Sequence, residues 1–166
     1  MTDEKSSLER FVQTQVKKWK TFPSASRADL TGPLPVVTVS MQPGSRGSAV
    51  AERLAERLDY DYFHRDMIQK IAESAHISAQ VIDSLEKERR SGVEDFISSL
   101  VMEHYMHPDT YVVHLMKVVN TIAEHGRAVI VGRGANFILP SQNRFAVRIM
   151  APLEIRIRNV AEAHDC

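Results

Sequence analysis

The chain has 166 residues, of which 43% are hydrophobic and 25% are charged, as is typical of one soluble globular domain. Its 21 Lys and Arg balance its 21 Asp and Glu, which excludes a net charge that attracts nucleic acid or anionic lipid. The single cysteine, Cys166, excludes a disulfide framework and indicates a reducing compartment. No apolar run approaches the ~20 residues of a membrane span, and the N-terminus lacks a signal peptide's apolar core. We therefore expect a cytoplasmic domain that binds neither nucleic acid nor a membrane.

Residues 1–34 differ in pattern from the rest of the chain. One helical stripe runs through them, formed by Leu8, Phe11, Val12, Gln15 and Trp19. Prolines and a glycine then interrupt regular structure, at Pro23, Gly32, Pro33 and Pro35. The pattern predicts an amphipathic helix followed by a linker. Such a helix either docks on a partner or folds back onto the domain, and we favour the second because a single aromatic stripe is usually buried core.

From residue 35 onward, short apolar runs alternate with helical patterns. We expect strands at 36–40, 60–63, 128–131 and 145–150. The helix after the first strand carries Val50, Leu54 and Leu58 on its predicted apolar face, and a basic helix is expected over 153–163. Gly126 is expected to end the helix before the third strand. This alternation predicts an α/β fold whose parallel sheet is covered on both faces.

A glycine-containing loop follows the first predicted strand and precedes a helix. Its residues are Gly44, Ser45, Arg46, Gly47 and Ser48. Glycines allow backbone N–H groups to turn inward, and the helix adds its partial positive end, so the loop is suited to phosphate. The alternative is a plain turn in which glycine only provides a positive φ. The loop also departs from the full phosphate-loop signature, because no lysine lies between Lys20 and Lys70.

Four blocks of the sequence together resemble the cytidylate kinase-like family of P-loop proteins. In chain order they are VVTVSMQPGSRG at 36–47, LAERLDYDYFHRDMI at 54–68, AVIVGRGANFIL at 128–139 and VRIMAPLEIRIR at 147–158. The resemblance extends over residues 35–166 and implies a P-loop NTPase-type parallel sheet flanked by helices, here lacking the family's lid and last strand. Residues 1–34 would then be an N-terminal helix and linker beside a family domain at 35–166.

The resemblance also implies a reaction, the transfer of a phosphoryl group from ATP, with Mg²⁺, to CMP or a similar nucleoside monophosphate. Such transfer depends on positioning and charge neutralisation. The implied ATP- and phosphate-binding residues are Gln42, Gly44, Ser45, Arg46, Gly47, Ser48, Arg156 and Arg158. The implied acceptor-binding residues are His64, Arg65, Asp66 and Arg133. Arg46 and Arg133 are the implied catalytic residues, and Ser48 is the implied magnesium ligand.

Three departures from the family pattern support an alternative. The family's G-S-G-G-R has Arg46 in place of a glycine and Ser48 in place of the arginine, and His64 stands in place of an acidic residue. The family also continues beyond the position of Cys166. The alternative is a catalytically impaired nucleotide-binding or interaction module, and a third interpretation is a fragment of a longer kinase. Because a sheet of four strands leaves an open edge, we expect the chain to form a homodimer or to transfer phosphate slowly.

Three histidines, His104, His107 and His114, suggest a metal site because residues three apart share a helix face. Pro108 and Asp109 interrupt that spacing, and no carboxylate pair completes a ligand set. We therefore favour surface or hydrogen-bonded histidines over metal ligands.

Overall fold

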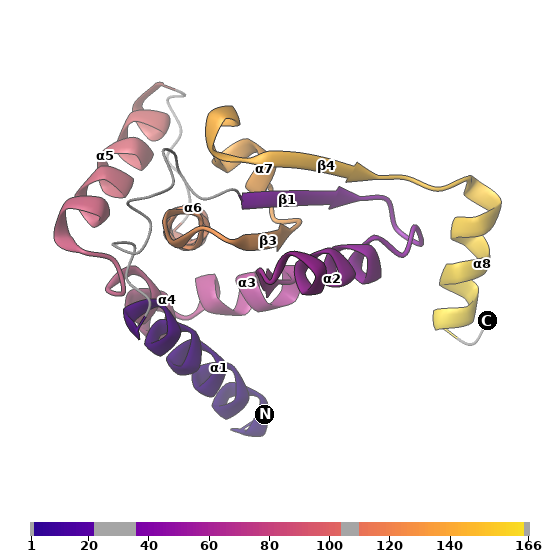
Figure 1. Ribbon diagram of the computed structural model, residues 1–166, viewed down its shortest axis with the longest axis horizontal. Helices are drawn as coiled ribbons and strands as arrows, with labels where there is room; N and C mark the ends of the chain where they lie inside the picture. Colours follow the sequence, from indigo (N-terminus) through magenta and orange to yellow (C-terminus); the bar gives the residue numbers. More distant parts are fainter. Residues whose placement is uncertain (1, 22–35, 104–109, 165–166) are drawn as a thin grey trace. The chain divides into compact units, whose positions relative to one another are not determined.

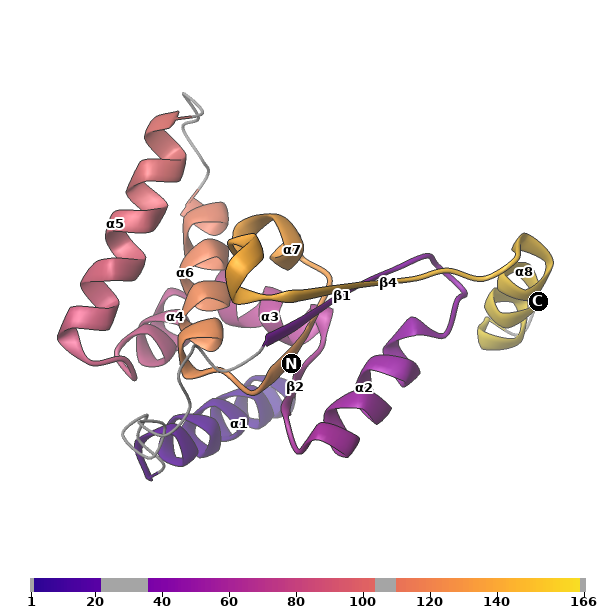
Figure 2. The ribbon, with the colours of Figure 1, turned by 45° about the horizontal axis from the view of Figure 1, so that its top comes forward.

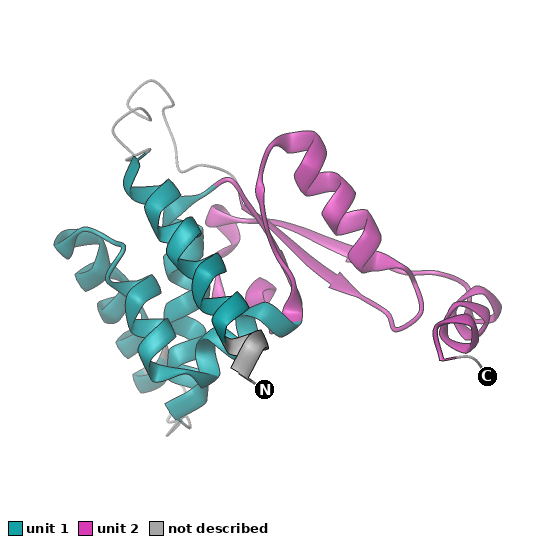
Figure 3. Cartoon of the chain, turned by 90° about the horizontal axis from the view of Figure 1, so that it is seen from below, with its two compact units in different colours: residues 1–34, 66–126 teal, residues 35–65, 127–166 magenta. Residues whose placement is uncertain are grey.

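The computed structural model describes residues 2–21, 36–103 and 110–164, and the chain divides into two compact units (Figure 3). One unit, which we call the helical unit, comprises residues 1–34 and 66–126. The other, the sheet unit, comprises residues 35–65 and 127–166. The sheet unit is therefore discontinuous in sequence. The predicted linker lies mostly at 22–35, outside the described residues.

The helical unit is built from segments of the chain that pack helix against helix. Its elements are α1 (Thr2–Thr21), most of α3 (Arg65–Glu73), α4 (Ala75–Ile82), α5 (Lys87–Glu103) and α6 (Thr110–His125) (Figure 1). Helix α1 packs against α4, and α6 packs against both α4 and α5. Val12, Gln15 and Trp19 are buried, so the predicted stripe of α1 faces the protein and the helix folds back as expected. No helix among the described residues is long and apolar enough to cross a membrane.

The sheet unit contains four parallel strands in the order β2-β3-β1-β4. They are β1 (Val36–Met41), β2 (Asp61–Phe63), β3 (Ala128–Val131) and β4 (Phe145–Ile149) (Figure 1). Val36 pairs with Ala128 of β3, and Val37 pairs with Phe145 of β4. The predicted α/β fold with a parallel sheet is confirmed, and each strand lies within one residue of its expected bounds.

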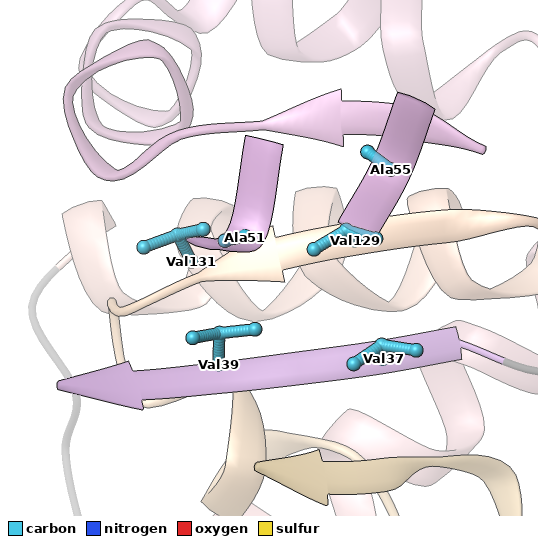
Figure 4. Close-up of a cluster of buried hydrophobic side chains, with 6 residues drawn as sticks. All are labelled: Val37, Val39, Ala51, Ala55, Val129 and Val131. Carbon is cyan, nitrogen blue, oxygen red and sulfur yellow. The ribbon is translucent and has the colours of Figure 1, made fainter. Parts of the chain in front are cut away.

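Helix α2 (Gly47–Leu58) covers one face of the central strands through small side chains. Figure 4 shows Ala51 and Ala55 above a cluster formed by Val37, Val39, Val129 and Val131. The predicted apolar face of this helix was wrong in part, because Val50 is 52% exposed and Leu58 is 42% exposed. Alanines four residues apart share a helix face, and their single methyl groups allow closer packing on a sheet than branched side chains do.

The edge strand β4 is much less covered than the strands at the centre of the sheet. The side chains of β3 are all buried and α7 (Ala135–Ile138) packs against β1, whereas Phe145 of β4 is 67% exposed. The expected cover on both faces therefore does not extend to β4. The chain continues through β4 into α8 (Leu153–Ala163), which has the predicted bounds and no buried residue (Figure 2).

Candidate functional site

The parallel sheet gathers the predicted site residues at one edge. Because all four strands run in the same direction, their carboxyl ends lie together, and ligands of open α/β sheets bind there. The loop 42–46 follows β1, His64 follows β2, Gly132 follows β3 and Met150 follows β4. All of these positions belong to the sheet unit, so one compact unit supplies the candidate site.

The loop between β1 and α2 has the backbone geometry of an anion site. Gly44 and Arg46 both adopt left-handed conformations, with φ values of 77° and 57°. The first hydrogen bond of the α2 helix joins the Val50 N–H to the Arg46 carbonyl at 3.3 Å. The N–H groups of residues 47–49 precede that bond, so they have no acceptor within the helix. Such groups, together with the helix dipole, favour a bound phosphate.

A serine hydroxyl and a glycine in this loop also favour phosphate binding. Ser45 Oγ is buried and has no hydrogen-bond partner among the described residues. Leaving a buried polar group unsatisfied costs about 1–3 kcal/mol, so the hydroxyl is suited to donate to a ligand oxygen. A side chain at Gly47 would meet the Met41 side chain, so glycine allows the loop to close against the end of β1. The loop therefore fits a phosphate group.

Helix α8 holds the loop from a second side. Asn159 Nδ2 donates to the Gly44 carbonyl at 2.7 Å, and Arg46 Nη2 forms an ion pair with Glu162 Oε2 at 3.1 Å. A Cβ added to Gly44 would collide with the backbone carbonyl of Arg156. Views of the ribbon place the loop after β1 beside the connection from β4 to α8 (Figures 1 and 2). The loop is thus fixed between the sheet and α8.

Arg46 has a left-handed backbone conformation, and its ion pair with Glu162 is too weak to offset the free-energy cost of that conformation. A non-glycine residue in this conformation costs roughly 1–2 kcal/mol. The ion pair with Glu162 is solvent-exposed, with side-chain exposures of 67% for Arg46 and 57% for Glu162. Exposed ion pairs contribute about 0–1 kcal/mol, which does not offset that cost. This ion pair therefore does not explain why an arginine, rather than a glycine, occupies the position.

The other residues predicted to bind ATP, which are Gln42, Arg156 and Arg158, differ in their contacts and exposure. Gln42 Oε1 accepts from the Ala151 N–H at 3.3 Å, and the Gln42 N–H donates to the Ile149 carbonyl at 3.1 Å. Arg156 Nε donates to the Ala151 carbonyl at 3.1 Å, whereas Arg158 is exposed on α8. Gln42 and Arg156 thus tie the loop to the start of α8, and their roles in binding ATP remain predictions.

The turn after β3 places Arg133 beside the end of β2. Gly132, Arg133 and Gly134 have φ values of 72°, 52° and 68°, three left-handed residues in succession. Arg133 Nε donates to the Arg65 carbonyl at 3.3 Å, and the pairing of β2 with β3 sets His64 near this turn. The structure therefore brings together three of the four predicted acceptor residues. The fourth, Asp66, is the second residue of α3.

Ser48 is the second residue of α2, and its exposed hydroxyl lies 3.6 Å from Met41 Sδ. Its backbone carbonyl accepts from the Tyr62 hydroxyl at 3.4 Å. Burial, and secondarily the charge of Glu52, raises the pKa of Tyr62 above its ordinary value. Ser48 fits Mg²⁺ as a single oxygen ligand, because this ion commonly takes its other ligands from substrate phosphates and water.

Only one of the three histidines considered as metal ligands, His114, lies among the described residues. His104 and His107 lie outside the described residues. His114 Nδ1 lies 3.3 Å from Ser78 Oγ, in a hydrogen bond within the helical unit. The described ranges contain no group of three or more His, Cys, Asp or Glu placed to hold a metal ion.

Two contacts of the loop, from Asn159 and Glu162, were missed by sequence reasoning. Neither residue belongs to a motif, and each matters only because α8 packs on the loop. Their spacing was the available signal, because Arg156, Asn159 and Glu162 follow one another at intervals of three and residues three apart share a helix face.

Comparison with known proteins supports the fold and the resemblance. The sequence model of the cytidylate kinase-like family matches residues 36–166. The crystal structure of an uncharacterized protein from Eubacterium ventriosum ATCC 27560 is similar, with a TM-score of 0.52 and 18% sequence identity. The match covers 80% of this chain and 63% of that chain, so this chain spans less than two thirds of that protein's length. At this identity the similarity shows the fold alone. No curated protein matches the sequence.

Proposed function

This chain belongs to the cytidylate kinase-like family, and from that membership we propose that it transfers a phosphoryl group from ATP to CMP or a similar nucleoside monophosphate. The family match supports a nucleotide-kinase-like function. The observation that carries the finer proposal is the loop 44–48, where the strained Arg46 caps the N-terminus of α2 and the preceding Ser45 Oγ is buried without a hydrogen-bond partner among the described residues.

The donor phosphates would bind to this loop. The N–H groups of residues 47–49 and the Ser45 hydroxyl would donate to phosphate oxygens. The Arg46 guanidinium would add a charge-assisted, bidentate contact. Because the loop has no lysine, Arg46 is the cation proposed to neutralise the charge that develops during transfer.

The acceptor phosphate would bind near the ends of β2 and β3. Arg133, Arg65 and His64 lie at these neighbouring strand ends, and the backbone of Arg65 holds the Arg133 side chain. In this proposal, Arg133 contacts the acceptor or the transferring phosphate. Mg²⁺ bound to the donor phosphates, with Ser48 as the protein ligand, would neutralise charge on the phosphate oxygens.

A second candidate, a nucleotide-binding module without turnover, is favoured by two observations. The loop lacks the lysine of the phosphate-loop signature, and the guanidinium of Arg46 is paired with Glu162. A loop of this kind binds phosphate without needing to stabilise a transition state.

A turnover assay separates the two candidates. ADP formation from ATP and Mg²⁺ is measured with CMP, UMP, dCMP, AMP and GMP as acceptors, for the wild type, Arg46→Ala and Arg53→Ala. Arg53 is an exposed arginine further along α2 and serves as the matched control. We expect pyrimidine-dependent turnover that falls about 10²-fold or more in Arg46→Ala and stays unchanged in Arg53→Ala. ATP binding is measured beside turnover by calorimetric titration. Binding without turnover would favour the module, and absence of ATP binding would contradict both candidates.

A further inference from the structure

One side of α8 carries three residues that converge on the phosphate loop. Arg156, Asn159 and Glu162 lie at intervals of three, so they share a side of the helix. The backbone of Arg156 lies against Gly44, Asn159 donates to the Gly44 carbonyl at 2.7 Å, and Glu162 pairs with Arg46 at 3.1 Å. These contacts differ in kind, since only the last involves two opposite charges.

The contact between Glu162 and Arg46 uses the guanidinium that the loop would offer to phosphate. A carboxylate and a phosphate group are alternative anionic partners of arginine, and each prefers paired N–H donors. A phosphate bound at the N-terminus of α2 would also place negative charge beside the Glu162 carboxylate. The two anions repel each other, so an occupied loop disfavours the observed position of Glu162.

We propose that Glu162 is an internal competitor for Arg46, and that phosphate binding to the loop 44–48 displaces it and loosens the last turn of α8. This inference rests on the proposed function, because its ligand is the phosphate donor. The neutral hydrogen bond from Asn159 to Gly44 does not compete with the ligand. The release therefore affects the helix beyond Asn159 and leaves the earlier turns attached to the loop.

By thermodynamic linkage, phosphate binding and the ion pair between Arg46 and Glu162 weaken each other equally. If a bound phosphate weakens the pair between Arg46 and Glu162, the pair weakens phosphate binding by the same factor. Removing the charge of Glu162 should therefore strengthen phosphate binding, although it removes a contact seen in the structure. A purely structural role of Glu162 predicts the opposite, because loss of the contact would then loosen the loop.

The test is a calorimetric titration with pyrophosphate of the wild type, Glu162→Gln and Glu154→Gln. Glu154 is an exposed acid in the first turn of the same helix and controls for the change in net charge. We expect Glu162→Gln to bind pyrophosphate about two- to fivefold more tightly at low salt, the scale of an exposed ion pair. The gain should shrink at high salt, where exposed charges are screened. Glu154→Gln should bind as the wild type does.

Hydrogen exchange of the last turn of α8 gives a readout that does not depend on affinity. The His164 N–H donates to the Val160 and Ala161 carbonyls, both at 3.2 Å, and reports fraying of this turn. Exchange in residues 160–164 should rise when pyrophosphate is added to the wild type. In Glu162→Gln it should be raised already and respond little to the ligand.

The outcomes distinguish this inference from the proposed function. Equal or weaker pyrophosphate binding by Glu162→Gln, or equal strengthening in Glu154→Gln, would overturn competition while leaving the phosphate site intact. If neither pyrophosphate nor ATP binds to any variant, the proposed function fails and competition for phosphate fails with it. The comparison of ligand-free exchange would then still show whether Glu162 holds the end of α8.

Discussion

The two edges of the sheet place non-glycine residues in the same strained backbone conformation but stabilise them differently. At the carboxyl edge these residues are Arg46 and Arg133, with φ values of 57° and 52°. At the amino edge they are Asp59 and Arg127, with φ values of 54° and 50°. Each left-handed residue costs roughly 1–2 kcal/mol, so each edge must offset a similar cost.

At the amino edge the strained residues contact each other. Their ion pair is also exposed, with side-chain exposures of 51% for Arg127 and 93% for Asp59, so the pair alone does not offset the cost. Arg127 Nη2 donates to Asp59 Oδ2 at 2.8 Å and to the Asp59 carbonyl at 3.2 Å. The Arg127 carbonyl also accepts from the Asp61 N–H at 2.8 Å, so these bonds join the end of α2 to the starts of β2 and β3. The strained residues at this edge therefore connect α2 to β2 and β3.

At the carboxyl edge the two strained residues are both arginines, so they cannot form an ion pair with each other. The Arg46 side chain reaches the exposed Glu162, and Arg133 Nε reaches the Arg65 carbonyl at 3.3 Å. The comparison indicates that strain at one edge connects elements of the fold, whereas strain at the other positions guanidinium groups where ligands of parallel sheets bind. The predictions below test that difference, from the largest expected effect to the smallest.

Gly44→Ala should produce the largest effect. Its Cβ would collide with the Arg156 backbone, and its φ of 77° is unfavourable for alanine. We expect a loss of about 2–4 kcal/mol in the free energy of unfolding, measured with urea, together with loss of pyrophosphate binding. Gly134→Ala is the control, because its φ is 68° but its Cβ would meet no atom within 4 Å. That variant should lose about 1 kcal/mol, and equal losses would contradict the role of the Arg156 contact.

Arg133→Ala should weaken nucleotide binding by about 1.5–3 kcal/mol, the scale of a charged hydrogen bond, with little change in thermal stability. Arg148→Ala removes an exposed arginine from β4 and should leave binding unchanged. Calorimetric titration with CMP and ATP, beside thermal melts, provides both measurements. A large fall in melting temperature with unchanged binding would assign Arg133 to the fold.

Arg46→Gly and Arg127→Gly compare the two edges directly. Each relieves a left-handed backbone and increases the entropy of the unfolded chain. Arg46→Gly also removes one exposed ion pair with Glu162, whereas Arg127→Gly removes two hydrogen bonds to Asp59. We expect the stability of Arg46→Gly to stay within about 0.5 kcal/mol of the wild type, and Arg127→Gly to lose about 1–2 kcal/mol. Pyrophosphate binding should change in the reverse order, falling in Arg46→Gly alone. Matching changes in both variants would remove the distinction between the edges.

Alkaline pH should reveal the smallest effect, through Tyr62. Its pKa is raised in the folded protein by burial and by Glu52, so the unfolded chain releases this proton first. The contribution of Tyr62 to stability is therefore constant below the ordinary tyrosine pKa of about 10 and is lost as the pH rises through its folded value. Tyr62→Phe should show a shallower fall in stability at alkaline pH, measured by urea unfolding. An unchanged slope would exclude this group as the cause.

Several elements of both units could be predicted from local sequence. The apolar runs of β1 and β3, the left-handed Gly44 and the Gly126 that ends α6 all depend on neighbours in the chain. The face of α2 could not be predicted in the same way. Hydrophobicity favoured Val50 and Leu58, but the close approach of helix and sheet selected Ala51 and Ala55. Periodicity identifies an amphipathic helix more easily than it measures the space beneath it.

The parts of the candidate site that directly follow a strand in the sequence could be predicted. The loop 44–48 and Arg133 follow their strands directly, so topology alone brings them to one edge. Asn159 and Glu162 depend instead on how α8 returns to the loop, a contact over more than 100 residues that no local pattern encodes. The exposure of Phe145 likewise follows from the place of β4 at the edge of the sheet rather than from its apolar sequence.

The strand order also affects the order in which the elements form their native contacts during folding. β1 lies between β3 and β4, whose paired residues come about 90 and 110 positions later in the chain, so its contacts are among the most distant in sequence. During synthesis, β1 leaves the ribosome well before either partner, whereas the helices of residues 66–126 already have near neighbours in sequence. During synthesis, the β1 amides therefore cannot be protected by pairing with β3 until Ala128 and the residues after it have been made. Pulse-labelling hydrogen exchange during refolding should show α5 and α6 protected before the strand that leads into the phosphate loop.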